Sequence, residues 1–253
     1  MNLALLLILI VLMICIGGSR GVISIMALLG NVIVFFISVY LMKYCNLYII
    51  VLFDIVFMCL LTLIYQNGVN IKTISSLIAV IFVSSILLVL SFIMGRLGNM
   101  GGYNEFELYE DTLMYLSVNI KLNLPDVSIC MLVLGVVGAL IDIAVAVTSS
   151  IHEVRINNES EDESEFIKTS LRLGKSIFGS TINTLWFACI GESLLMFLLF
   201  RKYHYSFVTL INSKAFFDMA AMILLSASGC ALVVPVAICA YVCISRYMKK
   251  TAE

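Results

Sequence analysis

Three acidic residues lie inside long apolar stretches of the sequence, at Asp54, Asp142 and Glu192. Placing a charged side chain at the centre of a membrane costs roughly 2.5–3.5 kcal/mol on insertion scales, so a carboxyl kept there indicates a function by default. Such a group can take up and release a proton. It can also stay protonated and hold two helices together through a hydrogen bond, and both interpretations remain open for Asp142.

Asp142 lies about 14 Å from the inner end of its predicted helix, and Asn183 lies about 9 Å from the same side, at 1.5 Å per residue. Small residues at helical spacing let two backbones approach closely. They accompany both positions, namely Gly135, Gly138, Ala139, Ala146 and Ser149 beside Asp142, and Gly179 and Thr184 beside Asn183. We therefore predict a tight polar seam, with Asp142 buried and within direct or water-bridged reach of Asn183.

Asp54 and Glu192 each fall about 12 Å from the outer surface by the same count. If the two carboxyls are close, their repulsion and burial favour a proton on at least one of them. Two separate carboxyls, protonated or reaching toward water, are the alternative.

The elements that carry these residues are predicted to be transmembrane helices. Hydrophobic residues make up 62% of the 253 residues, above the roughly 45–50% of a soluble domain, and the mean hydropathy is +1.11. A helix needs roughly 20 mostly apolar residues to cross a bilayer. We predict a single all-α membrane domain of about seven spans, at residues 2–16, 22–42, 46–65, 73–95, 127–151, 177–200 and 216–246.

The last of these spans is too long for one straight crossing, and Gly229 and Pro235 favour a bend or break within it. Residues 96–126 are predicted to be an outer interfacial segment, either an amphipathic helix or a solvated loop. Residues 152–176 are predicted to be a cytoplasmic loop, because an acidic run there is followed by a basic one.

Basic residues favour the cytoplasmic side of membrane proteins. An outer amino terminus and an inner carboxyl terminus place more of them inside than outside. The inner set is Arg20, Lys72, Arg155, Lys168, Arg172, Lys175, Arg246, Lys249 and Lys250.

Several classes of function are excluded. The formal charge is −1, with 15 basic and 16 acidic residues, so nucleic acid is not an expected partner. The eight cysteines form no C-x-x-C pair and the chain has two histidines, so no metal site is predicted. Soluble-enzyme motifs are absent, and we expect neither a cofactor nor an enzymatic activity.

Two long motifs resemble the signature of the YibE/F-like family of bacterial membrane proteins. They are GVVGALIDIAVAVTSSIHEV at 135–154 and LGKSIFGSTINTLWFACIGESL at 173–194. Shorter matches lie at GSRGVIS, GVNIKT and SASGCALVVP. The resemblance implies a multi-pass protein of the bacterial cytoplasmic membrane.

The sequence departs from the family pattern at two acidic positions. Lys175 and Ser176 stand where the family has Arg and Asp, and Glu192 replaces a Gly, whereas the Asn-Thr-Leu run that begins at Asn183 agrees. Asp142 is therefore the safest residue to carry over from the family.

A more distant similarity links the same helices to the transmembrane half of SecF and of RND-type exporters, with the second to seventh spans as a six-helix half. In that superfamily, polar residues of these helices are implicated in proton coupling and two halves pair. This similarity implies a partner, either a second copy or a longer YibE/F-like protein. The favoured function is thus a subunit of a transport or export complex, for which this similarity implies proton coupling. The alternative is a non-transporting membrane scaffold or assembly factor.

Overall fold

A computed structural model describes residues 2–42, 44–97, 124–157, 163–202, 204 and 206–252. These residues form helices, and no strand occurs among them. The elements are α1 (Asn2–Leu41), α2 (Leu47–Cys59), the π-helix η1 (Leu60–Tyr65), α3 (Ile71–Leu97), α4 (Leu124–Asn157), α5 (Glu163–Lys202), α6 (Phe207–Ile211) and α7 (Lys214–Ala252). Six helical segments of the described chain, with α2 and η1 as one, are long and apolar enough to cross a membrane. The predicted all-α membrane fold is confirmed.

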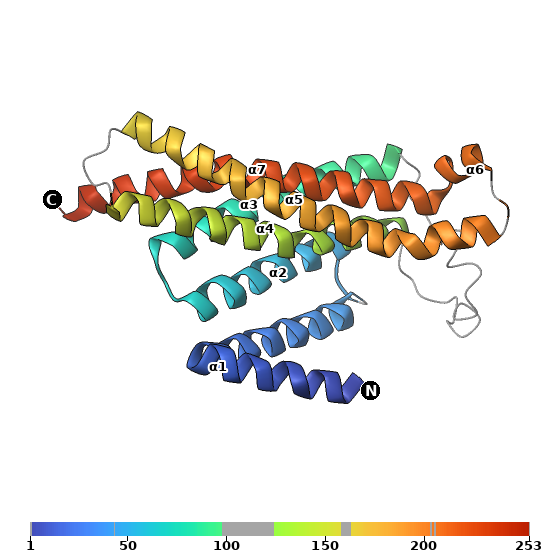
Figure 1. The fold of residues 1–253 in the computed structure, drawn as a ribbon, viewed down its shortest axis with the longest axis horizontal. Helices are drawn as coiled ribbons and strands as arrows, with labels where there is room; N and C mark the ends of the chain where they lie inside the picture. The colour runs from blue at the N-terminus through green and yellow to red at the C-terminus, as the bar shows by residue number, and fades with distance from the viewer. Residues whose placement is uncertain are drawn as a thin grey trace.

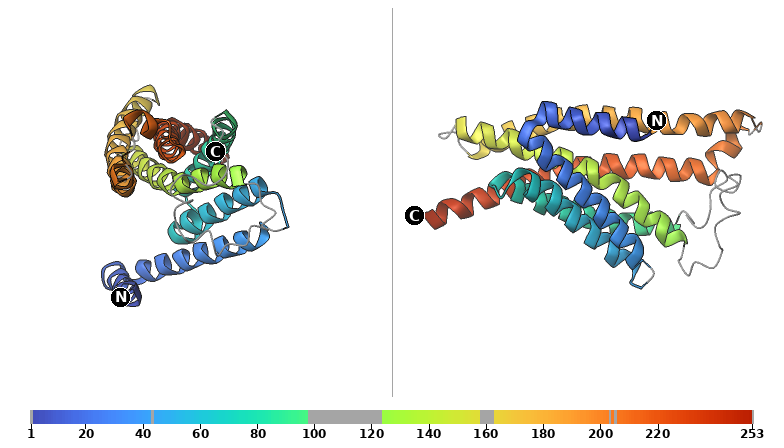
Figure 2. Two further views of the ribbon diagram at one scale, coloured as in Figure 1. Left: turned by 90° about the vertical axis from the view of Figure 1, so that its right-hand side faces the viewer. Right: turned by 90° about the horizontal axis from the view of Figure 1, so that it is seen from below.

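The helices are arranged in layers around a central group formed by α3, α4 and α7, which pack against one another (Figure 1). α5 covers one side of this group through contacts with α7 and α4. α2 covers another side, and α1 lies outside α2 and η1 (Figure 2, left). α1 is therefore the most peripheral helix, and most of its apolar side chains are exposed.

α1 changes direction sharply at Gly18, so that its two halves run in opposite senses along the long axis of the molecule (Figures 1 and 2). Gly18 has φ 54° and ψ −131°, a conformation that favours glycine. A Cβ on Gly21 would collide with the backbone carbonyl of Met13. The two predicted spans 2–16 and 22–42 correspond to these two halves.

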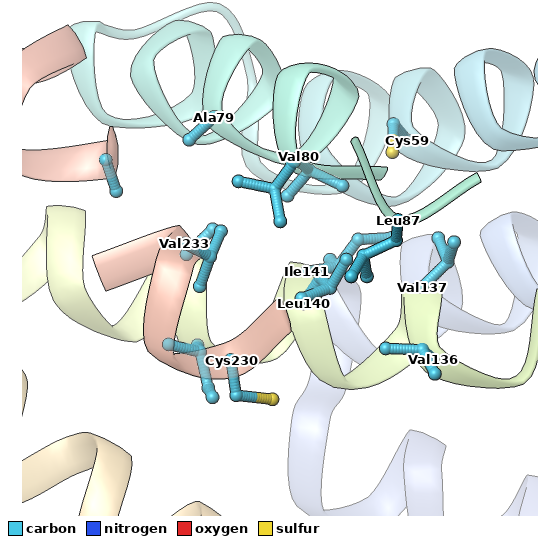
Figure 3. Close-up of a cluster of buried hydrophobic side chains, with 14 of the residues drawn as sticks. Cys59, Ala79, Val80, Leu87, Val136, Val137, Leu140, Ile141, Cys230 and Val233 are labelled. Atoms are coloured by element: carbon cyan, nitrogen blue, oxygen red, sulfur yellow. The ribbon is translucent and has the colours of Figure 1, made fainter. Parts of the chain in front are cut away.

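Branched aliphatic side chains from α3, α4 and α7 fill the central core (Figure 3). Leu87, Leu140 and Val233 are fully or almost fully buried there. Gly229 lets α7 approach closely, because a Cβ on it would lie 2.7 Å from a methyl group of Leu87 and 3.1 Å from one of Leu140. The close approach of α7 to α3 and α4 at Gly229 is therefore a contact within one chain.

The prediction of a loop at 152–176 was wrong. The segment is mostly helical, because α4 continues to Asn157 and α5 begins at Glu163. α7 is one continuous helix that contains Pro235, so of the predicted bend or break the break is absent. At 1.5 Å per residue, a helix as long as α7 spans about 60 Å, so it extends past the roughly 30 Å of hydrocarbon instead of breaking within it.

The carboxyl-terminal end of α7 lies beside the start of α5. Nε and Nη2 of Arg246 donate to the Glu163 carboxylate at 2.6 Å each. The α4–α5 connection and the end of α7 therefore share one end of the bundle, as predicted for two segments separated by two crossings. Most of the predicted interfacial segment, residues 98–123, lies outside the described residues.

Candidate functional site

Asp54 is a fully buried carboxyl on α2, with an exposed fraction of 0%. Its Oδ1 accepts a hydrogen bond from the Ser38 hydroxyl on α1, which is itself fully buried. Its Oδ2 is buried without a hydrogen-bond partner among the described residues. A carboxylate with one bare oxygen is strongly disfavoured in an apolar interior, so this group is suited to hold a proton.

Two further polar pairs join α1 to the same partner segment. Asn31 Nδ2 donates to Thr62 Oγ1 at 3.2 Å, and Gln66 Nε2 donates to Ser24 Oγ at 2.8 Å. Ser24, Asn31 and Ser38 are spaced seven residues apart, which places them on one face of α1. We call the three pairs the α1–α2 polar seam.

Thr62 of this seam lies within η1, where the helix is wound as a π-helix over Leu60–Tyr65. Short π-helical stretches are rare and are frequently found at functional sites. The Oδ1 of Asn31, its partner, is buried without a hydrogen bond within the described chain. The seam therefore contains two buried oxygens, Asn31 Oδ1 and Asp54 Oδ2, that could each accept a further hydrogen bond.

Asp142 is exposed on α4, so the prediction that it is buried was wrong for the single chain. The cause is the distribution of side chains around α4. Branched residues such as Val136 and Leu140 turn into the core, whereas Gly135, Gly138 and Asp142 lie on the opposite, open face.

Asn183 and Thr184 are also exposed, on α5. Thr184 Oγ1 donates to the Ser180 carbonyl at 3.3 Å. Within the described ranges, no direct hydrogen bond joins Asp142 to Asn183. A water-bridged contact between the two stays a prediction. A Cβ on Gly138 or Gly179 would meet no atom within 4 Å, so this face of α4 and α5 is open.

The predicted pairing of Asp54 with Glu192 stays a prediction. Glu192 lies in α5, but its side chain is outside the described part of the structure. The main contacts of α2 go to α1, α3 and α4, whereas those of α5 go to α4 and α7. The two helices therefore share α4 as a neighbour but are not main contacts of each other.

A polar cleft of about 310 Å³, which sequence reasoning missed, lies where α1 bends and α2 connects to α3. Its lining residues are Arg20, Gln66, Asn67, Asn70, Lys72, Thr73, Ser76, Val145, Thr148 and Ser149. The signal available in the sequence was the polar run from Gln66 to Thr73 between two apolar stretches. Ser149, which was predicted to belong to the polar seam of α4, lies in this cleft instead.

The cleft approaches the open face of α4. Val145 and Ser149 line it, and Asp142 precedes Val145 by about one helical turn. Water that fills the cleft would therefore reach α4 close to Asp142.

The fold and these buried polar groups define a multi-pass helical membrane protein. The family model described as YibE/F-like protein matches residues 5–246, so the chain belongs to this family. No curated protein and no solved structure matches the chain. The similarity to SecF and RND-type exporters thus stays a prediction.

Proposed function

We propose that the chain is a subunit of a proton-coupled membrane transport or export complex, in which Asp54 carries the proton. The observation that supports this proposal is the buried Asp54 carboxyl, with one oxygen hydrogen-bonded to Ser38 and the other without a partner among the described residues. A helix pair held only by packing would gain nothing from a carboxyl that is left half satisfied, because an unsatisfied buried polar group costs about 1–3 kcal/mol.

Proton transfer to Asp54 needs a route from water. The α1–α2 polar seam supplies hydroxyl and amide groups that begin at Gln66, which also lines the polar cleft. Asn31 and Thr62 follow about one turn deeper. Seven residues, about 10 Å along the helix, separate Asn31 from Ser38 on α1, so water between α1 and α2 would have to complete the route to Asp54.

A second chain is part of this proposal. The open face with Gly135, Gly138 and Asp142 on α4 and Asn183 on α5 would leave polar groups in lipid. It is also self-complementary, because it offers a carboxyl acceptor on one helix and amide donors on the other. A second copy, or a longer YibE/F-like protein, would cover it.

Proton flux in proteoliposomes tests the function. The complex is purified with its co-purifying partners and reconstituted in vesicles loaded with a small-molecule extract of the host cell, so that an unidentified substrate is present. An imposed pH gradient should decay faster with the wild-type complex than with Asp54→Asn, which keeps the size and hydrogen-bonding capacity of the side chain but cannot release a proton.

The control variant is Thr209→Ala, an exposed position on α6 far from the seam. It should match the wild-type rate. Equal decay in wild-type, Asp54→Asn and protein-free vesicles would reject transport and favour the scaffold.

A further inference from the structure

Two cavities of opposite character meet at Arg20. The first is the polar cleft of about 310 Å³ described above. The second is an apolar groove of about 360 Å³ on α1, lined by Leu12, Met13, Ile16, Gly17, Arg20, Gly21 and Ser24. Arg20 belongs to the lining of both, so the two form one continuous surface with a polar part and an apolar part.

The polar cleft has the charge of an anion site. Arg20 and Lys72 contribute two positive charges, and no acidic residue is among the lining residues. Neither cation has an ion-pair partner in the described part of the chain. The side-chain amides of Gln66, Asn67 and Asn70 each donate one N–H within the chain. The second N–H of each amide remains to bind an anion. This donor set matches the oxygens of a phosphate group.

The first turn of α3 adds to this set. Lys72 and Thr73 lie at the start of this long helix, where backbone N–H groups lack partners within the helix and the dipole favours an anion. The Thr73 hydroxyl is not part of the donor set. It lies within hydrogen-bond distance of two carbonyls, those of Gly68 and Asn70, and shares its single proton between them, which fixes the turn that precedes the helix. The cations and the helix start therefore face the same cleft.

The groove on α1 suits a hydrocarbon chain. Leu12, Met13 and Ile16 come from the first half of the helix, and Gly21 and Ser24 come from the second half, so the groove follows the inside of the bend at Gly18. It opens beside the exposed leucines of the amino-terminal half, such as Leu5 and Leu9. An acyl chain could pass from this groove directly into the bilayer.

We propose that this joined surface binds one phospholipid, with its phosphate between Arg20 and Lys72 and an acyl chain in the groove on α1. The site lies where α1 bends and α2 connects to α3, at the end of the bundle that also carries the ion pair of Arg246 with Glu163 (Figure 1). Phosphate groups of lipids lie at the level where spanning helices end. A free phosphate ion would use the polar cleft but leave the groove empty.

Native mass spectrometry of the detergent-solubilised protein tests this proposal. Three probes are titrated: dioleoyl phosphatidylglycerol, dioleoylglycerol with the same chains but no phosphate, and inorganic phosphate. The wild type should retain bound phosphatidylglycerol. It should retain neither dioleoylglycerol nor inorganic phosphate at equal concentration. Retained dioleoylglycerol would overturn the phosphate recognition, and binding of inorganic phosphate in preference to the lipid would overturn the lipid assignment.

Charge removal identifies the site. The double variant Arg20→Gln, Lys72→Gln should bind phosphatidylglycerol roughly 30-fold more weakly, because each basic residue near an anionic lipid contributes about fivefold. The matched control, Lys168→Gln with Arg172→Gln, removes the same charge from exposed positions on α5 and should bind as the wild type does. Equal weakening in both variants would assign the effect to net charge and reject the site.

A variant that exchanges the two basic residues separates loss of charge from loss of folding. Arg20→Lys with Lys72→Arg keeps both cations and should retain binding within about threefold, since lipid phosphates accept either cation. Loss of binding in this variant at an unchanged melting temperature would contradict a site held by charge.

Discussion

At the scale of single residues, Ser38 and Asp54 show what a membrane interior demands of a polar group. The hydroxyl on α1 donates to one carboxyl oxygen on α2, and the other oxygen has no partner within the described residues. In hydrocarbon, such a group must hold a proton or meet a donor from elsewhere. The pair thus links the packing of α1 to the protonation of Asp54.

A double-mutant cycle measures this link. Ser38→Ala, Asp54→Leu and the double variant are compared by thermal denaturation in detergent. We expect a coupling free energy of about 0.6–1.7 kcal/mol, the range of hydrogen bonds between membrane helices. The control cycle pairs Ser38→Ala with Thr209→Ala on α6, where no coupling is expected; a coupling near zero in the first cycle would mean that the hydrogen bond does not form.

Sequence reasoning found both in-membrane aspartates of α2 and α4 but assigned burial to the wrong one. Asp142 stands on the glycine face of α4, whereas Asp54 is enclosed by α1. Lipid is as apolar as a protein core, so hydropathy cannot show which face of a spanning helix is covered. Ser38 gave no signal of its own, because its role depends on how the second half of α1 packs against α2.

At the scale of elements, the bend at Gly18 divides α1 into two halves, and the α1–α2 polar seam belongs to the second half alone. This half brings Ser24, Asn31 and Ser38 against α2 and η1. The two spans on either side were predictable from length and hydropathy. Their angle was not, since it depends on one backbone conformation.

Substitution of Gly18 tests the bend. Gly18→Ala should destabilise the protein by about 1–3 kcal/mol, because a Cβ is strained at a φ of 54°. Gly17→Ala is the matched control, since a Cβ there meets no atom within 4 Å and the backbone has no positive φ. Melting temperatures of the two variants give the comparison, and equal values would contradict the bend as described.

At the scale of the whole molecule, the small residues divide into two groups. Ala27, Ser226 and Gly229 are buried within the monomer, and Gly30 packs against Leu61. Gly138 and Gly179 are open instead. If two chains pair, as predicted, the open positions on α4 and α5 are the expected place of contact.

A bulky residue on this face should separate the pair without unfolding the chain. Gly138→Leu is expected to shift the mass in mild detergent from a pair toward a monomer of 28.0 kDa, because small residues are needed for close helix contacts in membranes. Gly229→Ala, which would crowd Leu87 and Leu140, should instead lower the melting temperature. A wild type that is monomeric in mild detergent and in native lipid alike would reject the pair.

Infrared difference spectroscopy of Asp54 in native membranes tests the central claim, that this carboxyl carries a proton in transport. The wild-type spectrum should contain a protonated-carboxyl C=O band that Asp54→Asn removes and Asp142→Asn retains. This band should weaken reversibly as the pH is raised within the range in which the protein stays folded. A band that belongs to Asp54 and keeps its full intensity throughout that range would show a permanently protonated structural group and contradict the account.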